Sequence, residues 1–371
     1  MQRQRRYFER CVAMVMAAAM AVGLLSCSKK GTEPGGEPEV PMAFAPTVDW
    51  HSIANTKALI NSASDLRDYS ISILANATKE NSSGGGTTTY PVFKNHRLDY
   101  EGSAWTYSPT KYWIPGAEYS FVAFAPFAPT SNSPAGTDGK RTLSNGTFTI
   151  GGTDENPILT ISDYCTGRVT TGDKPFDARS EDLLRAYAYR NNTSAEDYSP
   201  VALNFEHLLA CVTFNIRNAT STDILTVSDI KLSGIKHKCD ITITPKYCQL
   251  ADPQGEISLS TNEFTSDNRT ATGSTALLPK GMSESEFKPL YDCTDLTVLP
   301  QNLYNKEQAS LTFTLVYRDS TTEQRILELD KIESIRSWEP GKKYNYNMTI
   351  TSQDIIFQVV EVPWVEHEVE L

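Results

Sequence analysis

The side chains that could carry out chemistry are scattered along this chain. Its histidines show no motif spacing; they are His51, His96, His207, His237 and His367. No Gly-x-Ser-x-Gly, phosphate-binding loop or His-Glu-x-x-His sequence occurs, and the many carboxylates form no recognisable glycosidase pair. Catalysis needs a nucleophile and base, or an acid–base pair, brought together in a cleft. The sequence therefore predicts a protein that is not an enzyme and that has no cofactor.

Two histidines have a local context. His207 has the same strand parity as Leu203 and Phe205, which favours a hydrogen-bonded core histidine. His237 and Cys239 are spaced like a pair of metal ligands, but no second pair with ligand spacing follows. We therefore expect no metal site.

Cys27 has the most specific context of the cysteines. An arginine-rich start precedes an apolar run over residues 11–25, which is shorter than the roughly 20 residues of a membrane-spanning helix. The run ends in Leu24-Leu-Ser-Cys27, which resembles the lipobox of bacterial lipoproteins. In such proteins the signal is cut before the cysteine, which is then acylated. We expect a signal peptide over residues 1–26 and lipidation of Cys27; an ordinary signal peptide with a chance cysteine is the alternative.

A lipidated chain would sit on a membrane without crossing it. Residues 28–40 are rich in Gly, Pro and Glu, so residues 27–40 are expected to form a lipidated, flexible tether. The full chain carries a formal net charge of −11, and loss of the basic signal makes it more acidic. This balance disfavours nucleic acid and anionic lipid as partners.

Five cysteines follow the lipidation site: Cys165, Cys211, Cys239, Cys248 and Cys293. An odd number in an exported protein leaves at least one unpaired. Cys211 lies in an apolar segment and is interpreted as a small buried hydrophobe. Cys239 and Cys248 could bridge a hairpin, but the sequence leaves the pairing open.

Short alternating segments separated by turn-rich loops predict an all-β protein built as a sandwich. Met42 and Phe44 share one face of a strand over residues 41–48, and the next alternating strand begins at Ile71. In the most apolar segment after the signal, residues 201–216, the apolar set changes parity near residues 207–211, which predicts a bulge or a crossing between sheets. We place a domain boundary just before this segment, with an N-terminal domain over 41–199 and a C-terminal domain over 200–371.

One nine-residue pattern, Trp-x-Pro-Gly-x-x-Tyr-x-Phe/Tyr, occurs at residues 113–121 and again at 338–346. Pro-Gly suits the centre of a type II turn, where glycine supplies a positive φ. The alternation that follows predicts a strand with one buried face. Each copy is therefore interpreted as a turn that starts a strand and is braced by aromatic side chains.

An ordered set of landmarks resembles the fimbrillin family of Gram-negative lipoproteins, the subunits of type V pili. The matching stretches are Trp105-Thr-Tyr107 through Trp113-Ile-Pro and Tyr119-Ser-Phe-Val-Ala-Phe-Ala-Pro126, Leu203-Asn-Phe-Glu-His207 through Val212-Thr-Phe, Leu299-Pro-Gln301, and Trp338 to Tyr346 ending at Trp364. The resemblance implies two transthyretin-like β-sandwich domains. It also implies that a trypsin-like, usually Arg-specific protease removes the lipidated N-terminal strand, and that a neighbouring subunit's strand fills the groove by donor-strand exchange.

Carried onto this chain, the removable strand runs from Met42 through Phe44 to Val48. Lys57 stands where the family often has its cleavable arginine, and Arg67, the first arginine after Cys27, is the alternative processing site. Lys29-Lys30 follows the lipid where acidic residues often accompany surface export, so a periplasmic location stays open.

We therefore hypothesise a structural pilus subunit or a pilus-associated adhesive lipoprotein. It would be lipid-anchored and surface-exposed on the cell outer membrane, and part of a fimbrium after processing. Its partners would be other pilus subunits, in a homo- or hetero-polymer, the processing protease, and host or bacterial surface ligands. The alternative is a glycan-binding cell-surface lipoprotein, whose exposed aromatic rings would stack on sugars; the candidates are Trp105, Tyr112, Trp113, Trp338 and Trp364.

Overall fold

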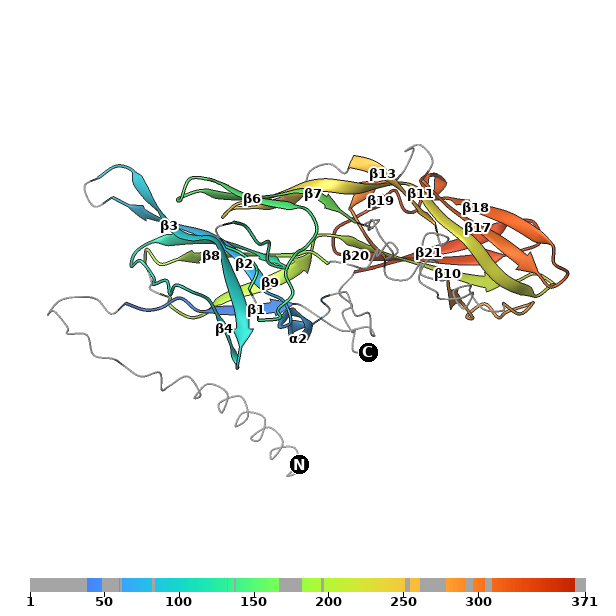
Figure 1. Ribbon diagram of the computed structural model, residues 1–371, viewed down its shortest axis with the longest axis horizontal. Coiled ribbons are helices and arrows are strands. Elements are labelled where there is room, and N and C mark those ends of the chain that lie inside the picture. Colours follow the sequence, from blue (N-terminus) through green and yellow to red (C-terminus); the bar gives the residue numbers. More distant parts are fainter. Residues whose placement is uncertain are drawn as a thin grey trace, which may run out of the picture. The chain divides into compact units, whose positions relative to one another are not determined.

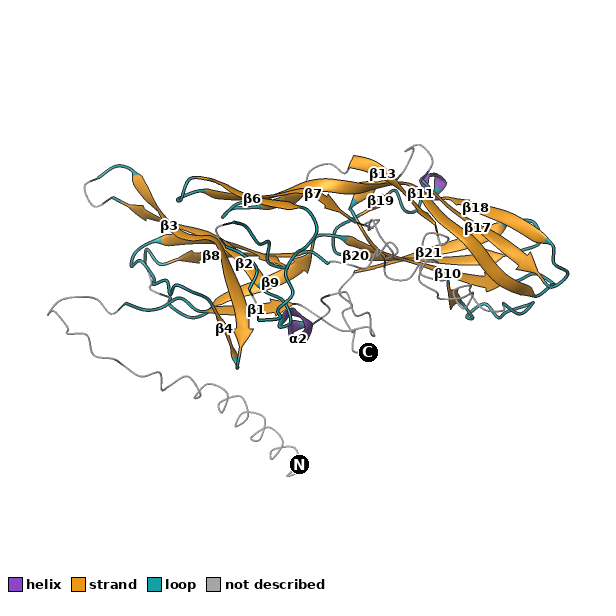
Figure 2. Ribbon diagram, viewed as in Figure 1, coloured by secondary structure: helices purple, strands orange, loops and turns teal. Residues whose placement is uncertain are grey.

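The computed structural model describes residues 39–48, 60, 62–81, 84–131, 133–136, 138–166, 182–194, 197–250, 254–260, 278–290, 296–303 and 309–363. The expected signal peptide, Cys27, most of the tether, Lys57 and the last residues from 364 onward lie outside these ranges. Nearly all of the regular secondary structure in the described residues is β-strand (Figure 2), which confirms the predicted all-β class. Its helical elements are α2 (Ala63–Leu66) and the 3₁₀ turn η1 (Leu329–Lys331).

The first sheet has seven strands in the order β1-β9-β8-β5-β2-β3-β4. Their bounds are β1 (Phe44–Val48), β9 (Val201–His207), β8 (Leu184–Asn191), β5 (Glu118–Ala125), β2 (Ile71–Glu80), β3 (Thr87–Glu101) and β4 (Ala104–Thr106). All neighbours in this sheet pair antiparallel except β1 and β9, which pair in parallel. The sheet thus begins at one edge with a strand from the start of the folded chain.

A second sheet has the order β14-β10-β20-β21, with β15 also paired to β10. These strands are β14 (Lys288–Pro289), β10 (Ala210–Asn218), β20 (Lys342–Ile350), β21 (Ile355–Pro363) and β15 (Leu296–Val298). A small separate pair joins β16 (Gln301–Asn302) to β19 (Ser337–Trp338).

A third sheet has the order β18-β17-β11-β7-β6, with β12 and β13 also paired to β11. These strands are β18 (Thr322–Glu328), β17 (Ser310–Tyr317), β11 (Ile224–Ile243), β7 (Pro157–Cys165), β6 (Thr147–Gly152), β12 (Cys248–Leu250) and β13 (Gln254–Ser260). The long strand β11 pairs with β17 through its first half and with β7 through its second half (Figure 1). One strand therefore joins pieces that lie far apart in the sequence.

The predicted crossing near residues 207–211 is confirmed. Strand β9 lies in the first sheet and β10 lies in the second, with the buried pair Leu208 and Leu209 between them. Because the chain changes sheets here, the parity of its buried residues changes as well. The division into domains 41–199 and 200–371 stays a prediction. Strand pairing crosses the proposed boundary, because β9 pairs with β1 and β8, and β11 pairs with β7.

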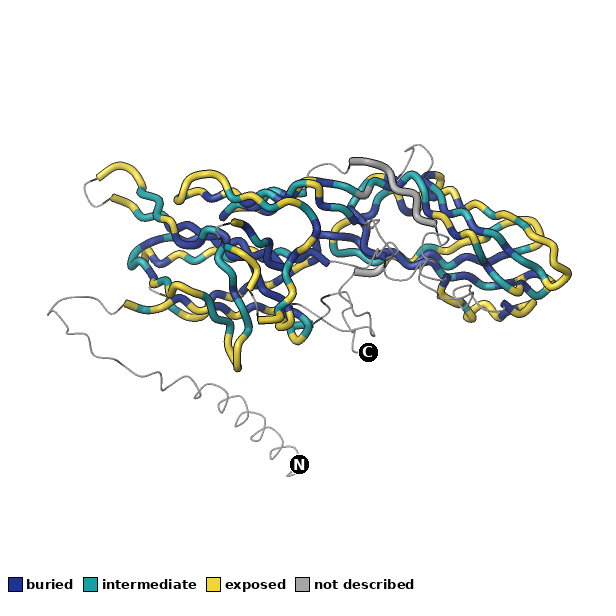
Figure 3. Tube along the Cα trace, viewed as in Figure 1, coloured by how far each residue is buried: buried dark blue, intermediate teal, exposed yellow. Residues whose placement is uncertain are grey.

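The central strands of the first sheet are buried on both faces (Figure 3). On β2, Ile71 and Ile73 belong to one apolar core, whereas Leu74 belongs to a second core that also includes residues of β7 and β11. A third core lies between the second sheet and the strands β11, β17 and β18. The edge strand β1 contributes to the first of these cores.

Both copies of the repeated pattern form the brace that the sequence predicts. Gly116 and Gly341 each have φ of +68°, as a type II turn requires at its third residue. In each copy the residue after the tryptophan donates its backbone N–H to the tyrosine hydroxyl: Ile114 to Tyr119 in the first, and Glu339 to Tyr344 over 2.9 Å in the second. The turn is thereby tied to the strand that it starts.

The two braces differ at their last aromatic residue. In the second copy the indole Nε1 of Trp338 donates to the hydroxyl of Tyr346 over 2.9 Å. The first copy has Phe121 at the matching position, and Trp113 Nε1 has no hydrogen-bond partner in the described part of the chain. Trp113 instead packs edge-on against the ring of Tyr119, with centroids 4.8 Å apart.

The hairpin bridge considered for Cys239 and Cys248 is not formed. Cys239 lies opposite Tyr164 and Cys248 lies opposite Ile243, so the two thiols occupy different rungs of the ladder. Burial raises the pKa of each thiol to about 12. Cys211 is buried as predicted, and Cys293 lies outside the described residues.

The shared brace bond predicts a matched stability effect. Tyr119→Phe and Tyr344→Phe should each lower the free energy of unfolding by about 1–2 kcal/mol, because each removes the acceptor of a partly buried N–H group. Tyr247→Phe, at an exposed ring, serves as the control and should change it little. Urea denaturation measures all three, and brace variants as stable as the control would contradict the role of the hydroxyls.

Candidate functional site

The first strand, β1, is the candidate functional element of this structure. Its residues alternate strictly between buried and exposed (Figure 3), with Phe44, Pro46 and Val48 facing inward. Pro46 cannot donate a backbone hydrogen bond, which an edge strand tolerates. The strand therefore inserts apolar side chains into the core while its backbone stays at the edge of the sheet.

Among the described strands, β1 pairs with β9 alone (Figure 1). The register runs from Phe44 opposite Val201 to Val48 opposite Phe205. Val201 N donates to Ala43 O over 2.8 Å, and the exposed hydroxyl of Thr47 donates to Asn204 Oδ1 over 2.6 Å. Parallel pairing is slightly weaker per residue than antiparallel pairing. The backbone of β1 is thus held along one side by a short ladder.

The chain just before β1 pairs with a different segment. Met42 N donates to Lys111 O over 2.9 Å, and Trp113 N donates to Val40 O over 3.0 Å. The hydroxyl of Tyr107 also donates to Met42 O over 2.9 Å. The predicted strand over residues 42–48 therefore begins at Phe44 as an element of the sheet, because the backbone of Met42 is bonded to the turn before the first brace.

Phe44 is the anchor of β1. Its ring meets the rings of three aromatic residues edge-on, with centroid separations of 5.5, 5.6 and 6.0 Å; these are Phe93, Tyr107 and Phe121. The Phe44 side chain is 6% exposed. Such edge-to-face contacts add to the large area that an aromatic ring buries. Loss of β1 would expose these three rings to water.

The chain that follows β1 also reaches the same core. Ile60 and Leu66 are fully buried there beside Met42, Phe44 and Val48. Leu66 is the last residue of α2, which begins after Ser62, whose Oγ accepts a hydrogen bond from Asp65 N over 3.0 Å. Sequence reasoning identified Met42 and Phe44 from their alternation, and Val48 as the end of the removable strand that the resemblance implies. It missed Ile60 and Leu66, since isolated apolar residues outside a regular strand or long helix carry no periodic signal.

Arg67 lies at the C-terminal end of α2 with its side chain exposed. Its guanidinium carbon lies 4.5 Å from the centre of the Tyr100 ring. The flanking backbone is hydrogen-bonded: Lys140 Nζ donates to Arg67 O over 2.6 Å, and Arg141 N donates to Asp68 O over 2.9 Å. A protease can reach the side chain, but the peptide bond must first leave these contacts. Lys57 and Cys27 lie outside the described residues.

Two of the five aromatic residues considered for sugar binding are buried in the apolar cores. Trp113 and Trp338 are 5% and 1% exposed and fill two different cores. Trp105 is half-buried against Tyr100, whereas Tyr112 is exposed and Trp364 lies outside the described residues. The two buried tryptophans cannot stack on a sugar, so no specific observation favours the glycan-binding alternative.

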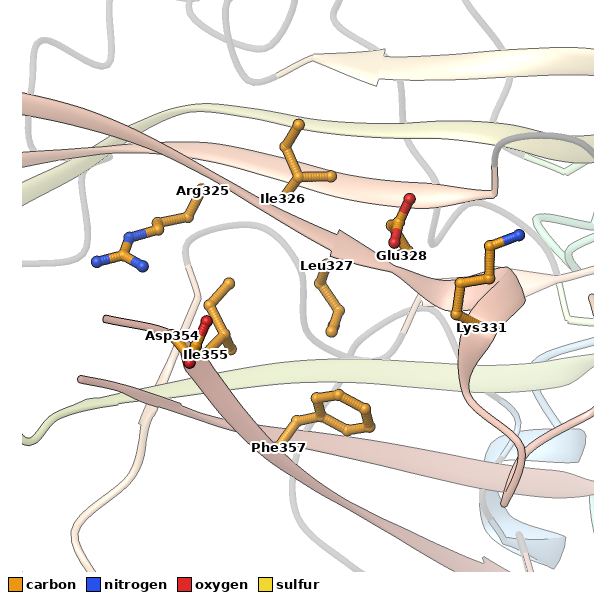
Figure 4. Close-up of a pocket in the computed structure, with 8 residues that line it drawn as sticks. All are labelled: Arg325, Ile326, Leu327, Glu328, Lys331, Asp354, Ile355 and Phe357. Atoms are coloured by element: carbon orange, nitrogen blue, oxygen red, sulfur yellow. The ribbon is translucent and has the colours of Figure 1, made fainter. Parts of the chain in front are cut away.

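A surface pocket of about 380 Å³ opens between β18 and the start of β21 (Figure 4). Arg325 on its rim donates to the carbonyls of Gln353 and Thr351 over 3.1 and 3.2 Å, and to Glu323 over 3.0 Å. These contacts fix the turn between β20 and β21, so the arginine serves the fold rather than a ligand.

Within the described ranges, no cluster of His, Cys, Asp or Glu could hold a metal ion, and no helix is long and apolar enough to cross a membrane.

In its sequence and in its fold, this chain is similar to fimbrial proteins. A family model described as fimbrillin-like matches residues 67–364, so β1 precedes the matched range. A fimbrial protein of Bacteroides vulgatus superimposes with a TM-score of 0.52 at 17% identity, covering 88% of this chain and 99% of the other. The tip fimbrial protein Mfa3 of Porphyromonas gingivalis, with a C-terminal truncation, gives 0.36 at 11% identity over 88% and 100%. No curated protein matches the chain.

Substitutions on the two faces of β1 test whether its inward side chains stabilise the core. Phe44→Ala should lower the free energy of unfolding by about 3 kcal/mol or more, because it leaves a cavity among three aromatic rings. Thr47→Ala, on the exposed face of the same strand, should cost less than about 1 kcal/mol. Equal losses from the two variants in urea denaturation would contradict the seating of β1 in the core.

Proposed function

The chain belongs to the fimbrillin-like family, and on this premise we propose that it is a structural pilus subunit or a pilus-associated adhesive lipoprotein. The family gives the chain a fimbrial or cell-adhesion role, at the cell surface or in a fimbrium, with other pilus subunits as partners. Its role in such an assembly is structural rather than enzymatic.

The geometry of β1 is the observation that carries the assembly mechanism. Strand β1 is an edge strand that pairs with β9 alone among the described strands. It supplies Phe44 and Val48, and the residues just before it supply Met42, to a core built otherwise by later parts of the chain. A strand with these properties can be exchanged for another, because a donor of matching alternation recovers the ladder and fills the same positions. Donor-strand exchange at this place is therefore the proposed route of polymerisation.

The proposal includes an anchor and a cut. Cys27 would hold the unprocessed subunit on the outer membrane through its acyl chains until a trypsin-like protease removes the first strand. Cutting at Arg67 would detach β1 together with Ile60 and Leu66, whereas cutting at Lys57 would leave those two core residues in place. The choice of site therefore decides how much of the first core a donor must replace.

Proteolysis of the unlipidated protein tests this function. An Arg-specific protease should cut after Arg67 and give a new N-terminus at Asp68, and cut protein should form SDS-resistant ladders as exchanged strands lock neighbouring copies. Trypsin, which also accepts lysine, should instead give Ala58 if Lys57 is the accessible site.

Arg67→Ala and Lys57→Ala are the matched variants for this experiment. Each should abolish only its own cut, as read by N-terminal sequencing. A protein that stays whole and monomeric with both proteases would contradict processing and polymerisation, and would leave the family role of an anchor or tip.

A further inference from the structure

A buried carboxylate lies beside the place where β1 ends. Asp182 is 1% exposed and precedes β8. Its Oδ1 lies 3.0 Å from Nδ1 of His207, the last residue of β9. Its Oδ2 accepts the backbone N–H of Ile60 over 3.2 Å. Strand β1 ends with Val48 opposite Phe205, two residues before His207. This group, Asp182 with His207 and Ile60 N–H, is called the clasp below.

The carboxylate and the imidazole are positioned without help from Ile60. Leu184 pairs with His207 across β8 and β9, and Leu208 N donates to Leu183 O over 2.8 Å. The two side chains thus extend from backbone that the first sheet already fixes. His207 is 3% exposed, so the pair is shielded from water on both sides. This confirms the interpretation of His207 as a hydrogen-bonded core histidine.

Ile60 joins this fixed pair to the N-terminal segment. The residue is fully buried and belongs to the same core as Met42 and Phe44. Its N–H reaches a carboxylate that lies 122 residues later in the sequence. Moving the segment away breaks a hydrogen bond to a carboxylate, and such bonds contribute more than bonds between neutral groups. The contact therefore favours the state in which the N-terminal segment is in place.

We propose that Asp182, oriented by His207, is a positioning residue that retains the N-terminal segment in its seat. It holds the segment beyond the end of β1, while the bonds of Val40 and Met42 to residues 111–113 hold it before the strand. The inference deepens the proposed function: it rests on β1 being the exchangeable strand, and it adds what opposes its early release.

Ile60, the N-terminal member of the clasp, lies between the two candidate processing sites, which gives each cut a different consequence. After a cut at Lys57 the whole clasp stays with the mature chain, and Ile60 is the third residue after the cut. After a cut at Arg67 Ile60 belongs to the fragment that must leave, and Asp182 holds that fragment. Release of β1 should therefore be slower after cutting at Arg67, and removal of the Asp182 carboxylate should accelerate it.

Amide hydrogen exchange of the intact, unlipidated protein tests the clasp before any processing. Asp182→Asn should accelerate exchange in peptides covering residues 40–48 and 62–66 by roughly tenfold or more, since a charge-assisted hydrogen bond is lost. Peptides from β10 and β20 should exchange as in the unchanged protein. Asp163→Asn, at an exposed carboxylate paired with Lys238, is the matched control and should leave residues 40–48 and 62–66 unaffected.

A second variant separates positioning from general destabilisation. His207→Asn offers Asp182 an amide donor near the place of Nδ1 and should leave exchange in residues 40–48 and 62–66 as in the unchanged protein, whereas His207→Ala should accelerate it. Unchanged exchange in Asp182→Asn, or equal acceleration across β10 and β20, would overturn the clasp. Because exchange is read on uncut protein, this outcome is independent of ladder formation, which tests the proposed function separately.

Discussion

The first apolar core depends on side chains of β1, an edge strand that pairs with β9 alone among the described strands. Phe44 fills a space bounded by three aromatic rings, and Met42 and Val48 continue the same inward row. Most of the rest of that core comes from strands β2, β3, β5, β8 and β9, which pair antiparallel with one another, and Ile60 and Leu66 add to it. Without β1 this core lacks the side chains of Phe44 and Val48, and this is the physical basis of the proposed strand exchange between subunits.

The remaining architecture supports this arrangement instead of adding a ligand site. The two Trp-Pro-Gly braces bury their tryptophans in separate cores and tie each turn to its strand. Strand β11 pairs with both β7 and β17 and so joins distant parts of the chain within the third sheet. Trp113 and Trp338, two of the side chains considered for sugar binding, are thereby used for packing, and the proposed function rests on the edge strand β1.

Local patterns predicted much of this structure, and long-range contacts account for the rest. Alternation identified the inward face of β1, and the parity change identified the crossing between β9 and β10. The brace followed from Pro-Gly and the aromatic spacing. The contact of Ile60 with Asp182 and the pairing of β11 with both β7 and β17 depend on register between distant segments, which no short sequence window contains.

The most direct test of the account is the return of β1 to a chain that has lost it. Protein cut at Arg67 is separated from its N-terminal fragment, and a synthetic peptide of residues 39–48 is added while thermal unfolding and binding are measured. The account predicts one-to-one binding and a rise in Tm, with no effect from a peptide carrying Phe44→Asp. A stripped chain that unfolds at the temperature of the intact protein and binds neither peptide would contradict it.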